Sequence, residues 1–335
     1  MSALTRLAGL VVVIVGVTIV TFAISHMIPG DPAQMLAGPR ATPETVARIR
    51  ADLGLDRSFA VQYARYVGDL LHGDLGTSIV TGRPVAGDLA QVFPATVELI
   101  VSALFISVSF GILIGTLAAV FRGSFFDVGA RLLASASLSI PAFWLALVML
   151  LLFYGVLGWL PGDGRIGVAF DPPPHATGFY TIDALLAGNL SLLGDVLAHL
   201  MLPALTLALA SIGGIIRVVR SSMIEVLGED YVRTAVASGL RRRTVIFNHA
   251  LRNALIPVVT VLGLEAAALL FGSVVVETVF VWPGAGSYVL GAIFALDFPV
   301  IMGFTVIASV AYVLINSGVD LLYRVLNPQI REIGR

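Results

Sequence analysis

The chain has 335 residues, of which 58% are hydrophobic and only 12% are charged, and its mean hydropathy is +0.96. A soluble domain has about 25% charged residues, so this composition excludes an ordinary water-soluble protein and predicts a chain that is solvated mostly by lipid. The net charge of −1 provides no basic field that would attract nucleic acid.

Two residue types are missing from the sequence. There is no cysteine, which excludes disulfides, thiolate metal sites and cysteine nucleophiles. All 20 basic residues are arginine, and a phosphate-binding P-loop requires a lysine. If ATP drives this protein, another chain must therefore bind it. The five histidines are scattered without metal-ligand spacing, so we predict no metal site.

Six apolar runs are long enough to cross about 30 Å of hydrocarbon as helices, and they predict an all-α polytopic membrane protein with six transmembrane helices. The runs are Leu7–Ile24, Leu99–Phe121, Leu132–Leu160, Val196–Ile216, Leu255–Val276 and Phe298–Val319. The flanks of the first run resemble those of a signal peptide, but its apolar part is too long and five spans follow, so we expect it to be retained. Pro141 and Pro203 are expected to interrupt and kink the third and fourth spans.

The segment between the first two spans is predicted to contain two helices. Thr42 can cap the first, which begins at Pro43 and stops at Gly54, and the second runs from about Ala60 to Leu71. Two roles stay open: this region guards the outer mouth or meets a substrate-delivering partner, or it is a simple cap over the helices. The later loop 161–195 is rich in proline and glycine, which predicts irregular structure with no recognisable chemistry.

The arginines predict the orientation of the spans. Cytoplasmic loops hold an excess of positive charge near helix ends, and six spans place both termini on one side. The loops and tails on that side contain most of the arginines, whereas the opposite side has only Arg165 in a short loop. The long first loop is discounted by this rule. Both termini are therefore predicted to be cytoplasmic.

The uncharged stretch Thr278–Leu296 is nearly long enough to form a seventh span. Trp282, Pro283 and Gly284 interrupt it, and a seventh span would move the C-terminal arginines outside. We therefore expect a turn followed by a short interfacial helix, Ser287–Leu296, on the external side.

The polar segment 221–253 follows the fourth span and is too long for a simple turn. Small residues at Ala235, Ala237 and Gly239 would let another surface approach closely, while flanking acids and arginines would orient it, as a partner-docking helix requires. A basic loop resting on anionic lipid headgroups would explain the arginines, but not the acids or the small-residue spacing.

The run at 225–240 reads Glu-Val-Leu-Gly-Glu-Asp-Tyr-Val-Arg-Thr-Ala-Val-Ala-Ser-Gly-Leu, and His-Ala-Leu-Arg-Asn-Ala-Leu-Ile-Pro follows at 249–257. These motifs resemble the "EAA" loop of the dipeptide and oligopeptide permeases of bacterial ATP-binding-cassette (ABC) importers. Pro257 falls later after Gly239 than in the broader importer superfamily, a departure that the peptide-permease branch shares. Four further segments resemble signatures of the same branch in the same order: Ile28–Pro32, Gly73–Ser78, Leu160–Gly162 and Val276–Gly286.

The resemblance implies a type I ABC importer transmembrane domain in the bacterial inner membrane. It divides the chain into a first helix with an external region (1–94), a core (95–326) and a cytoplasmic tail (327–335). The implied partners are a second homologous permease subunit, two ATPase subunits that bind ATP and magnesium, an external substrate-binding protein, a peptide substrate and membrane lipid. The chain itself would have no catalytic residue, cofactor or metal.

Within this resemblance, the region Arg233–Arg243 would form a coupling helix that lies in a groove of an ATPase subunit. The predicted coupling residues are Glu225, Gly228, Asp230, Tyr231, Arg233, Thr234, Ala235, Ala237, Gly239, Arg241 and Arg242. The predicted signature of the external region is Pro29, Gly30, Asp31 and Pro32.

Two acids fall within or beside the fifth span. Glu265 lies near its middle, where a carboxylate usually faces a cavity or a partner, so Glu265 is the first candidate for the translocation path. It would attract the ammonium end of a peptide, with a structural pairing as the alternative. Glu277 is a second candidate for the path, and its place in a family signature favours a structural role.

Other functions compete with a peptide importer. The same importer class carries other small solutes, such as nickel or glutathione. A stand-alone secondary transporter would typically place several coupling acids at the midplane, whereas this chain has one. An intramembrane enzyme would need a nucleophile–base or metal constellation within the spans, and none is evident.

Overall fold

The computed structural model describes residues 3–27, 32–38, 40–52 and 54–326, which are helical almost throughout. Among these residues the only β-structure is an isolated bridge between Thr77 and Pro84. The chain divides into two compact units, the first comprising residues 1–93 and 288–313 and the second residues 94–287 and 314–335. The predicted tail 327–335 and the signature residues Pro29, Gly30 and Asp31 lie outside the described residues, while Pro32 is the first residue of a helix.

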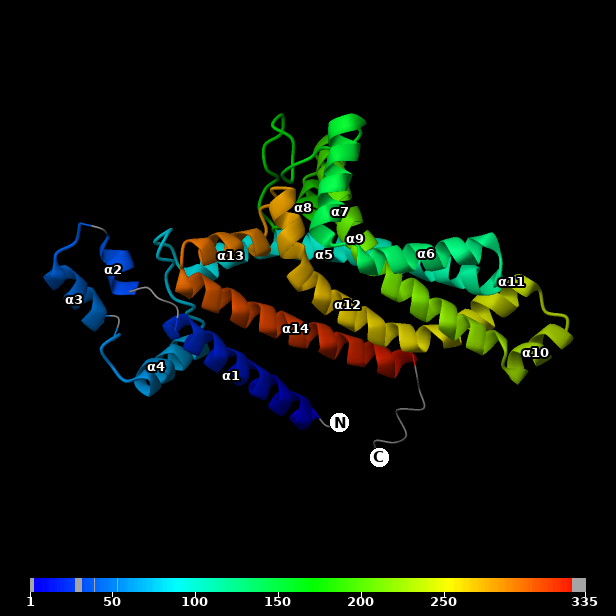
Figure 1. Cartoon of the computed structure of the whole chain (residues 1–335), viewed down its shortest axis with the longest axis horizontal. Helices are drawn as coiled ribbons and strands as arrows, with labels where there is room; N and C mark the ends of the chain where they lie inside the picture. The colour runs from blue at the N-terminus through cyan, green and yellow to red at the C-terminus, as the bar shows by residue number, and fades with distance from the viewer. Residues whose placement is uncertain (1–2, 28–31, 39, 53, 327–335) are drawn as a thin grey trace. The chain divides into compact units, whose positions relative to one another are not determined.

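The elements labelled in Figure 1 follow one another along the chain. The α-helices are α1 (Ala3–Met27), α2 (Pro32–Ala37), α3 (Pro43–Asp52), α4 (Phe59–Leu71), α5 (Val85–Val120), α6 (Phe125–Ser139), α7 (Ala142–Met149), α8 (Tyr180–Leu186), α9 (Leu190–Leu227), α10 (Asp230–Ala237), α11 (Arg242–Thr244), α12 (Arg252–Val279), α13 (Ala285–Phe294) and α14 (Phe298–Leu326). Two π-helical segments, η1 (Leu150–Val156) and η2 (Val245–Leu251), continue α7 and lead into α12.

Four of the described helical segments are long and apolar enough to cross a membrane: Val85–Val120, Leu190–Leu227, Arg242–Val279 and Phe298–Val319. The number of candidate spans rises to five if α6 and the helix after it are counted together as one bent span. The predicted first span falls in α1, which has 25 residues and whose apolar described part is Val12–His26. The apolar helices thus follow the predicted runs.

The predicted third span, Leu132–Leu160, is not one straight helix. Helix α6 begins earlier, at Phe125, and ends at Ser139, and the next helix leaves at an angle of 109°. Pro141 causes this break, because it lacks an N–H group and forces the preceding Ile140 into an extended conformation with φ −83° and ψ 125°. The kink expected at Pro141 is confirmed, and it is a complete break between two helices and not only a bend within one.

Pro203 behaves differently. Helix α9 runs from Leu190 to Leu227 without a break, so Pro203 does not divide the fourth span, and the kink expected there stays a prediction. The proline is buried, and 67% of the most apolar part of α9 is covered by neighbouring segments. The proline removes one backbone hydrogen bond, and packing against neighbouring segments keeps the helix continuous in spite of this loss.

The first unit contains the two predicted helices of the external region. Helix α3 begins at Pro43, as expected, and the Thr45 N–H donates to Thr42 Oγ1 at 3.3 Å, which confirms the cap. Helix α4 packs on α1 through aromatic rings: Phe22 is buried against Tyr63 and Tyr66, with ring centroids 5.5 Å away in both cases. Burial, with Tyr63 nearby, raises the pKa of Tyr66 to about 12.

A second core in this unit surrounds the beginning of α5. Val85 and Leu89 pack with Ala292 and Val300 from α13 and α14. Tyr288 Oη donates to Asp88 at 2.8 Å, which fixes α13 on α5. The prediction of a turn and a short helix in 278–296 is confirmed, although α13 begins at Ala285 and ends at Phe294.

The second unit is built around α9, which packs against α12 on one side and α6 on another. Close approach requires small residues: a Cβ added to Gly111 or Gly115 of α5 would lie 2.7 or 2.8 Å from side-chain atoms of Ile215 or Val219. The loop expected to be irregular, 161–195, contains α8 and the beginning of α9, so that expectation is partly wrong. Asp183 stabilises this local structure because it accepts the backbone N–H groups of residues 177 and 178.

Candidate functional site

The segment after α9 forms a short exposed helix, α10, at the end of the second unit where α9 leads into α12 (Figure 1). Helix α10 begins at Asp230 because the extended backbone of Glu229, with φ −70° and ψ 148°, turns the chain there. It ends at Ala237, and Gly239 has φ +78°, a left-handed conformation that favours glycine. The coupling helix expected over Arg233–Arg243 is therefore corrected: Gly239 ends it early, and Arg242–Thr244 form the separate helix α11.

One face of α10 is attached to the rest of the second unit. Val232 is buried, at 3% exposure, and Asn253 Nδ2 at the start of α12 donates to Tyr231 Oη at 2.7 Å. Tyr231, a predicted coupling residue, thus also joins α10 to α12. These contacts hold α10 at a defined position relative to the start of α12.

The other face of α10 and its flanks are open. Among the predicted coupling residues Ala235 is half-buried, and the exposed ones are Glu225, Gly228, Asp230, Tyr231, Arg233, Thr234, Ala237, Gly239, Arg241 and Arg242. Arg233 and Asp230 form a pair at 3.4 Å with both side chains largely exposed, and such pairs stabilise a fold little. Within the described residues Arg241, Arg242 and Arg243 form no ion pair. This surface carries charge that the chain itself does not neutralise.

Gly239 is required by its backbone conformation and not by packing inside the chain. A Cβ at this position would meet nothing within 4 Å, so the space beside it is open. A larger residue would both strain the turn and fill space that a partner surface would otherwise occupy.

An apolar pocket of about 330 Å³ lies behind α10. Its lining comes from the ends of α5 and α9, from α10 and from the segment leading to α12: Val120, Leu227, Val232, Val236, Leu240, Arg242, Val245 and Ile246. Val236 is 60% exposed at the edge of this pocket. The surface around α10 is therefore mixed, with arginines at the rim and aliphatic side chains inside.

The two acids of α12 lie in different surroundings. Glu277 is fully buried, accepts from Thr96 Oγ1 at 2.7 Å and from the Ser287 N–H at 2.9 Å, and packs so closely that a Cβ on Gly284 would overlap its carboxylate. Glu265 is half-buried, has no hydrogen-bonding or ionic partner among the described residues, and lies against Gly214 of α9. Only Glu265 thus keeps a carboxylate available to a ligand.

The sequence analysis missed a buried charged cluster in the second unit. Arg165 donates to Glu98 Oε2 and to the Gly178 carbonyl, and its guanidinium lies 3.5 Å from the centre of the Tyr180 ring. Thr181 donates to Glu98 Oε1 through its backbone N–H at 2.8 Å and its hydroxyl at 2.6 Å. The only signal in the sequence is that Arg165 is the single arginine of its loop.

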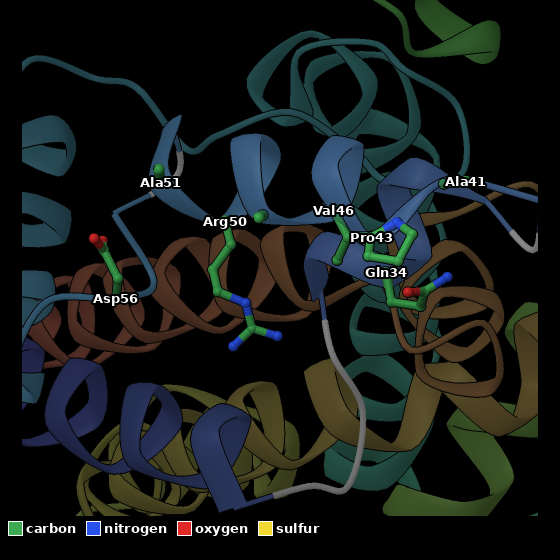
Figure 2. Close-up of a pocket in the computed structure, with 8 residues that line it drawn as sticks. Gln34, Ala41, Pro43, Val46, Arg50, Ala51 and Asp56 are labelled. Carbon is green, nitrogen blue, oxygen red and sulfur yellow. The ribbon is translucent and has the colours of Figure 1, made fainter.

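The external region contains a more open pocket of about 420 Å³ around α2 and α3. Figure 2 shows Arg50 extending from α3 into this space, with Asp56 on one side and Gln34 on the other. All three side chains are exposed, so the pocket is an open surface hollow of mixed polar and apolar lining and not an enclosed site.

Comparisons with known proteins match nearly the whole chain. A family described as "Binding-protein-dependent transport system inner membrane component" matches residues 111–332, and the corresponding N-terminal family, "Binding-prot-dependent transport system membrane comp, N-term", matches residues 2–100.

Similar proteins have names from peptide transport. The "Probable D,D-dipeptide transport system permease protein" of Escherichia coli (strain K12) is 54% identical over 329 residues, which cover 98% of this chain and 97% of the relative. The "Di/tripeptide transport system permease protein" of Pseudomonas aeruginosa (strain UCBPP-PA14) is 44% identical, with 98% of this chain and 97% of the relative covered. The "Dipeptide transport system permease protein" of Escherichia coli (strain K12) is also 44% identical, with 98% of each covered. With its core and its N-terminal region both matched, the chain belongs to the family of binding-protein-dependent transport system inner membrane components.

Proposed function

We propose that this chain is the permease subunit of an ATP-driven importer and forms the membrane pathway for dipeptides or short oligopeptides. The observation that carries the proposal is the match over 98% of the chain to permeases whose names specify dipeptide transport. The apolar helices supply a membrane-embedded body of the required kind. The names of these relatives do not favour a nickel or glutathione importer of the same class, and the size of the α10 segment argues against a stand-alone secondary transporter.

The energy source lies on other chains. Because the sequence has no lysine, it has no P-loop, and ATP and magnesium would bind to separate ATPase subunits. The full assembly would contain two such subunits, a second homologous permease and an external substrate-binding protein. Affinity purification of this chain from its native membrane should retain the ATPase and second permease chains. Recovery of the chain alone, with unaided peptide transport after reconstitution, would overturn the proposal.

We assign α10 to the contact with an ATPase subunit. The exposed arginines Arg233, Arg241 and Arg242 attract an acidic partner surface, and the exposed Val236 contributes apolar contact area. The attachment of Tyr231 to Asn253 would pass movement of α10 directly to α12.

We also propose six spans with both termini in the cytoplasm. The support is the arginine distribution: α10 and its flanks are rich in arginine, whereas the short loop on the opposite side has only Arg165, and the long first loop is discounted by the rule. Single cysteines test this in the naturally cysteine-free chain. Ala237→Cys should react with a membrane-impermeant thiol reagent only from the cytoplasmic side, and Val168→Cys, at a fully exposed position, only from the other side.

For the translocation path we propose that Glu265 receives the ammonium group of the peptide. Its carboxylate is unpaired among the described residues, and a charge within a span is expensive unless it serves a ligand or a cavity. Glu265→Gln should raise the half-saturating concentration about tenfold or more for peptides with a free amino terminus, since it removes a charge-assisted hydrogen bond. N-acetylated peptides are the control, and an equal change for both would refute the assignment.

A further inference from the structure

Helix α6 is attached to the second half of α9 at two separate points. At the first, Ser137 Oγ donates to the Leu209 carbonyl at 2.6 Å and accepts from the Gly213 N–H at 3.1 Å. Leu209 and Gly213 are one turn apart, the spacing at which backbone groups pair within an α-helix. The Ser137 hydroxyl on α6 therefore bonds to a carbonyl and an N–H group of the α9 backbone that are spaced as a helical hydrogen-bonded pair.

The second point is a buried ion pair nearer the start of α6. Arg220 on α9 donates through Nε and Nη2 to the two carboxylate oxygens of Asp127, which is 1% exposed. The Gly123 N–H also donates to this carboxylate, at 3.0 Å. A two-pronged arginine–carboxylate pair fixes orientation as well as distance.

Between these points the helices pack with little space. Ala130 and Ala134 of α6 form one buried cluster with Ile212 and Ile216 of α9. A Cβ added to Gly213 would lie 2.5 Å from the Ala134 carbonyl oxygen. The contact is thus continuous over the length of α6, and neither helix can slide without breaking polar bonds at both ends.

The attachment ends near a weak point in each helix. Helix α6 stops at Ser139, just after Ser137, and the next helix leaves at 109°. In α9 the bonds to Ser137 reach back to Leu209, and the preceding part of the helix contains Pro203, which has no N–H group to donate to the backbone ladder. Glu265 lies against Gly214, within the part of α9 that α6 holds. From Leu209 the helix continues to Leu227, and α10 follows.

We propose that α6 is a strut that makes the 209–227 part of α9 and the following α10 move as one rigid body, which turns relative to the part of α9 before Leu209 and carries Gly214 past Glu265. Asp127, Arg220 and Ser137 are then positioning residues for coupling: they convert movement of α10 into movement at the Glu265 level instead of bending within α9. This inference rests on the proposed contact of α10 with an ATPase subunit.

Spin-label distances in the assembled transporter test the rigid body directly. Labels at Phe125→Cys on α6 and Ser221→Cys on α9 should keep one distance in the nucleotide-free and vanadate-trapped states. Labels at Leu190→Cys and Ser221→Cys, which lie on opposite sides of Leu209 in α9, should change distance between the same states. All three positions are exposed, and the chain has no native cysteine. A changing Phe125–Ser221 distance, or an unchanged Leu190–Ser221 distance, would overturn the proposal.

Removal of the strut contacts should uncouple the assembly. Ser137→Ala should lower the amount of peptide transported per ATP hydrolysed about fivefold. The matched control is Ser139→Ala, because Ser139 is exposed and bonds only within its own helix, to the Ser135 carbonyl at 2.9 Å. Equal coupling in the two variants would refute the role of Ser137.

The ion pair permits a rescue experiment that separates positioning from folding. Asp127→Asn should reduce coupling and broaden the Phe125–Ser221 distance distribution, while Asp127→Glu should restore both at least in part because the charge remains. If Asp127→Asn assembles poorly, the distances in the Ser137→Ala variant decide the question. Failure of the α10 contact is recognised separately: Ala237→Cys then forms no cross-link to an ATPase subunit in the unmodified assembly.

Discussion

The surface around α10 and the interior near Glu98 and Arg165 differ in whether their charged side chains are buried and paired. Near Arg165 the charged groups are buried and each meets a partner from the same chain. Around α10 the arginines are exposed, and Arg241, Arg242 and Arg243 form no ion pair with any described residue. Charges satisfied within the chain hold a structure together, whereas the exposed, unpaired charges around α10 are available to the ATPase surface that we propose. Mutations should therefore affect stability in the first region and coupling in the second.

The largest stability effect is expected from Arg165→Ala. It leaves the Glu98 carboxylate buried without its counter-charge, and removal of one partner of a buried pair costs about 3–5 kcal/mol. Thermal unfolding of the purified complex measures this change. The double variant Arg165→Ala/Glu98→Gln should recover part of the loss, and a double variant less stable than either single one would contradict the pairing.

A smaller loss is expected from Glu277→Ala. Thr96 and the Ser287 N–H would both lose this acceptor in a fully buried site, and we expect a total loss of about 1–3 kcal/mol, the cost of one neutral donor that stays unpaired. Glu265→Ala, in the same helix, should leave unfolding nearly unchanged because no described residue bonds to that carboxylate. Equal destabilisation by the two variants would remove the distinction between a structural acid and a free one.

The hydrogen bonds to Asp183 should make the stability of the folded protein depend modestly on pH. Burial opposes ionisation of Asp183, but the bonds from Thr177 and Gly178 outweigh it and lower its pKa below the ordinary value. A lowered pKa in the folded state contributes stability above the unfolded pKa of about 3.9, and this contribution is lost as pH falls through the folded value. Asp183→Asn should thus be less stable than the unmodified protein by about 1–2 kcal/mol at pH 7, with the difference shrinking below pH 4. A difference that grows on acidification would contradict this sign.

The smallest stability effect is expected from Arg233→Ala on α10. Arg233 is 73% exposed and its pair with Asp230 is weak, so the melting temperature should not change measurably. Substrate-stimulated ATP hydrolysis should nevertheless fall, because the partner surface loses a cation. A variant with normal hydrolysis and reduced stability would reverse the proposed contrast.

Local features of the fold could be predicted from the sequence where one residue dominates its neighbourhood. Pro141 has no N–H group and breaks the third span, and Thr42 caps α3. The continuity of α9 through Pro203 could not be predicted in this way, because the covering of α9 by other segments, which supports a helix across a proline, is not a local property. Helix α10 was misplaced by a few residues because the resemblance marked a region, while Gly239 sets its end.

The contacts that organise the second unit could not be predicted in the same way. Glu98 and Arg165 are 67 positions apart, and Asp127 and Arg220 are 93 apart, so no periodicity links them. Glu98 and Asp127 each lie beside an apolar run, where an acid usually indicates only the end of a span. The candidate coupling surface was predictable because its residues are contiguous, whereas buried pairs depend on how distant helices pack.

Cross-linking from α10 tests the central claim most directly. A photoreactive or bifunctional thiol reagent on Ala237→Cys, in the cysteine-free chain, should form a product with an ATPase subunit, and the yield should change between nucleotide-free and vanadate-trapped states. Gly239→Trp, which fills the open space beside this position, should abolish both the product and substrate-stimulated ATP hydrolysis. The account would be contradicted if Ala237→Cys forms no product with an ATPase subunit in an actively transporting assembly, or if Gly239→Trp leaves hydrolysis and transport coupled as before.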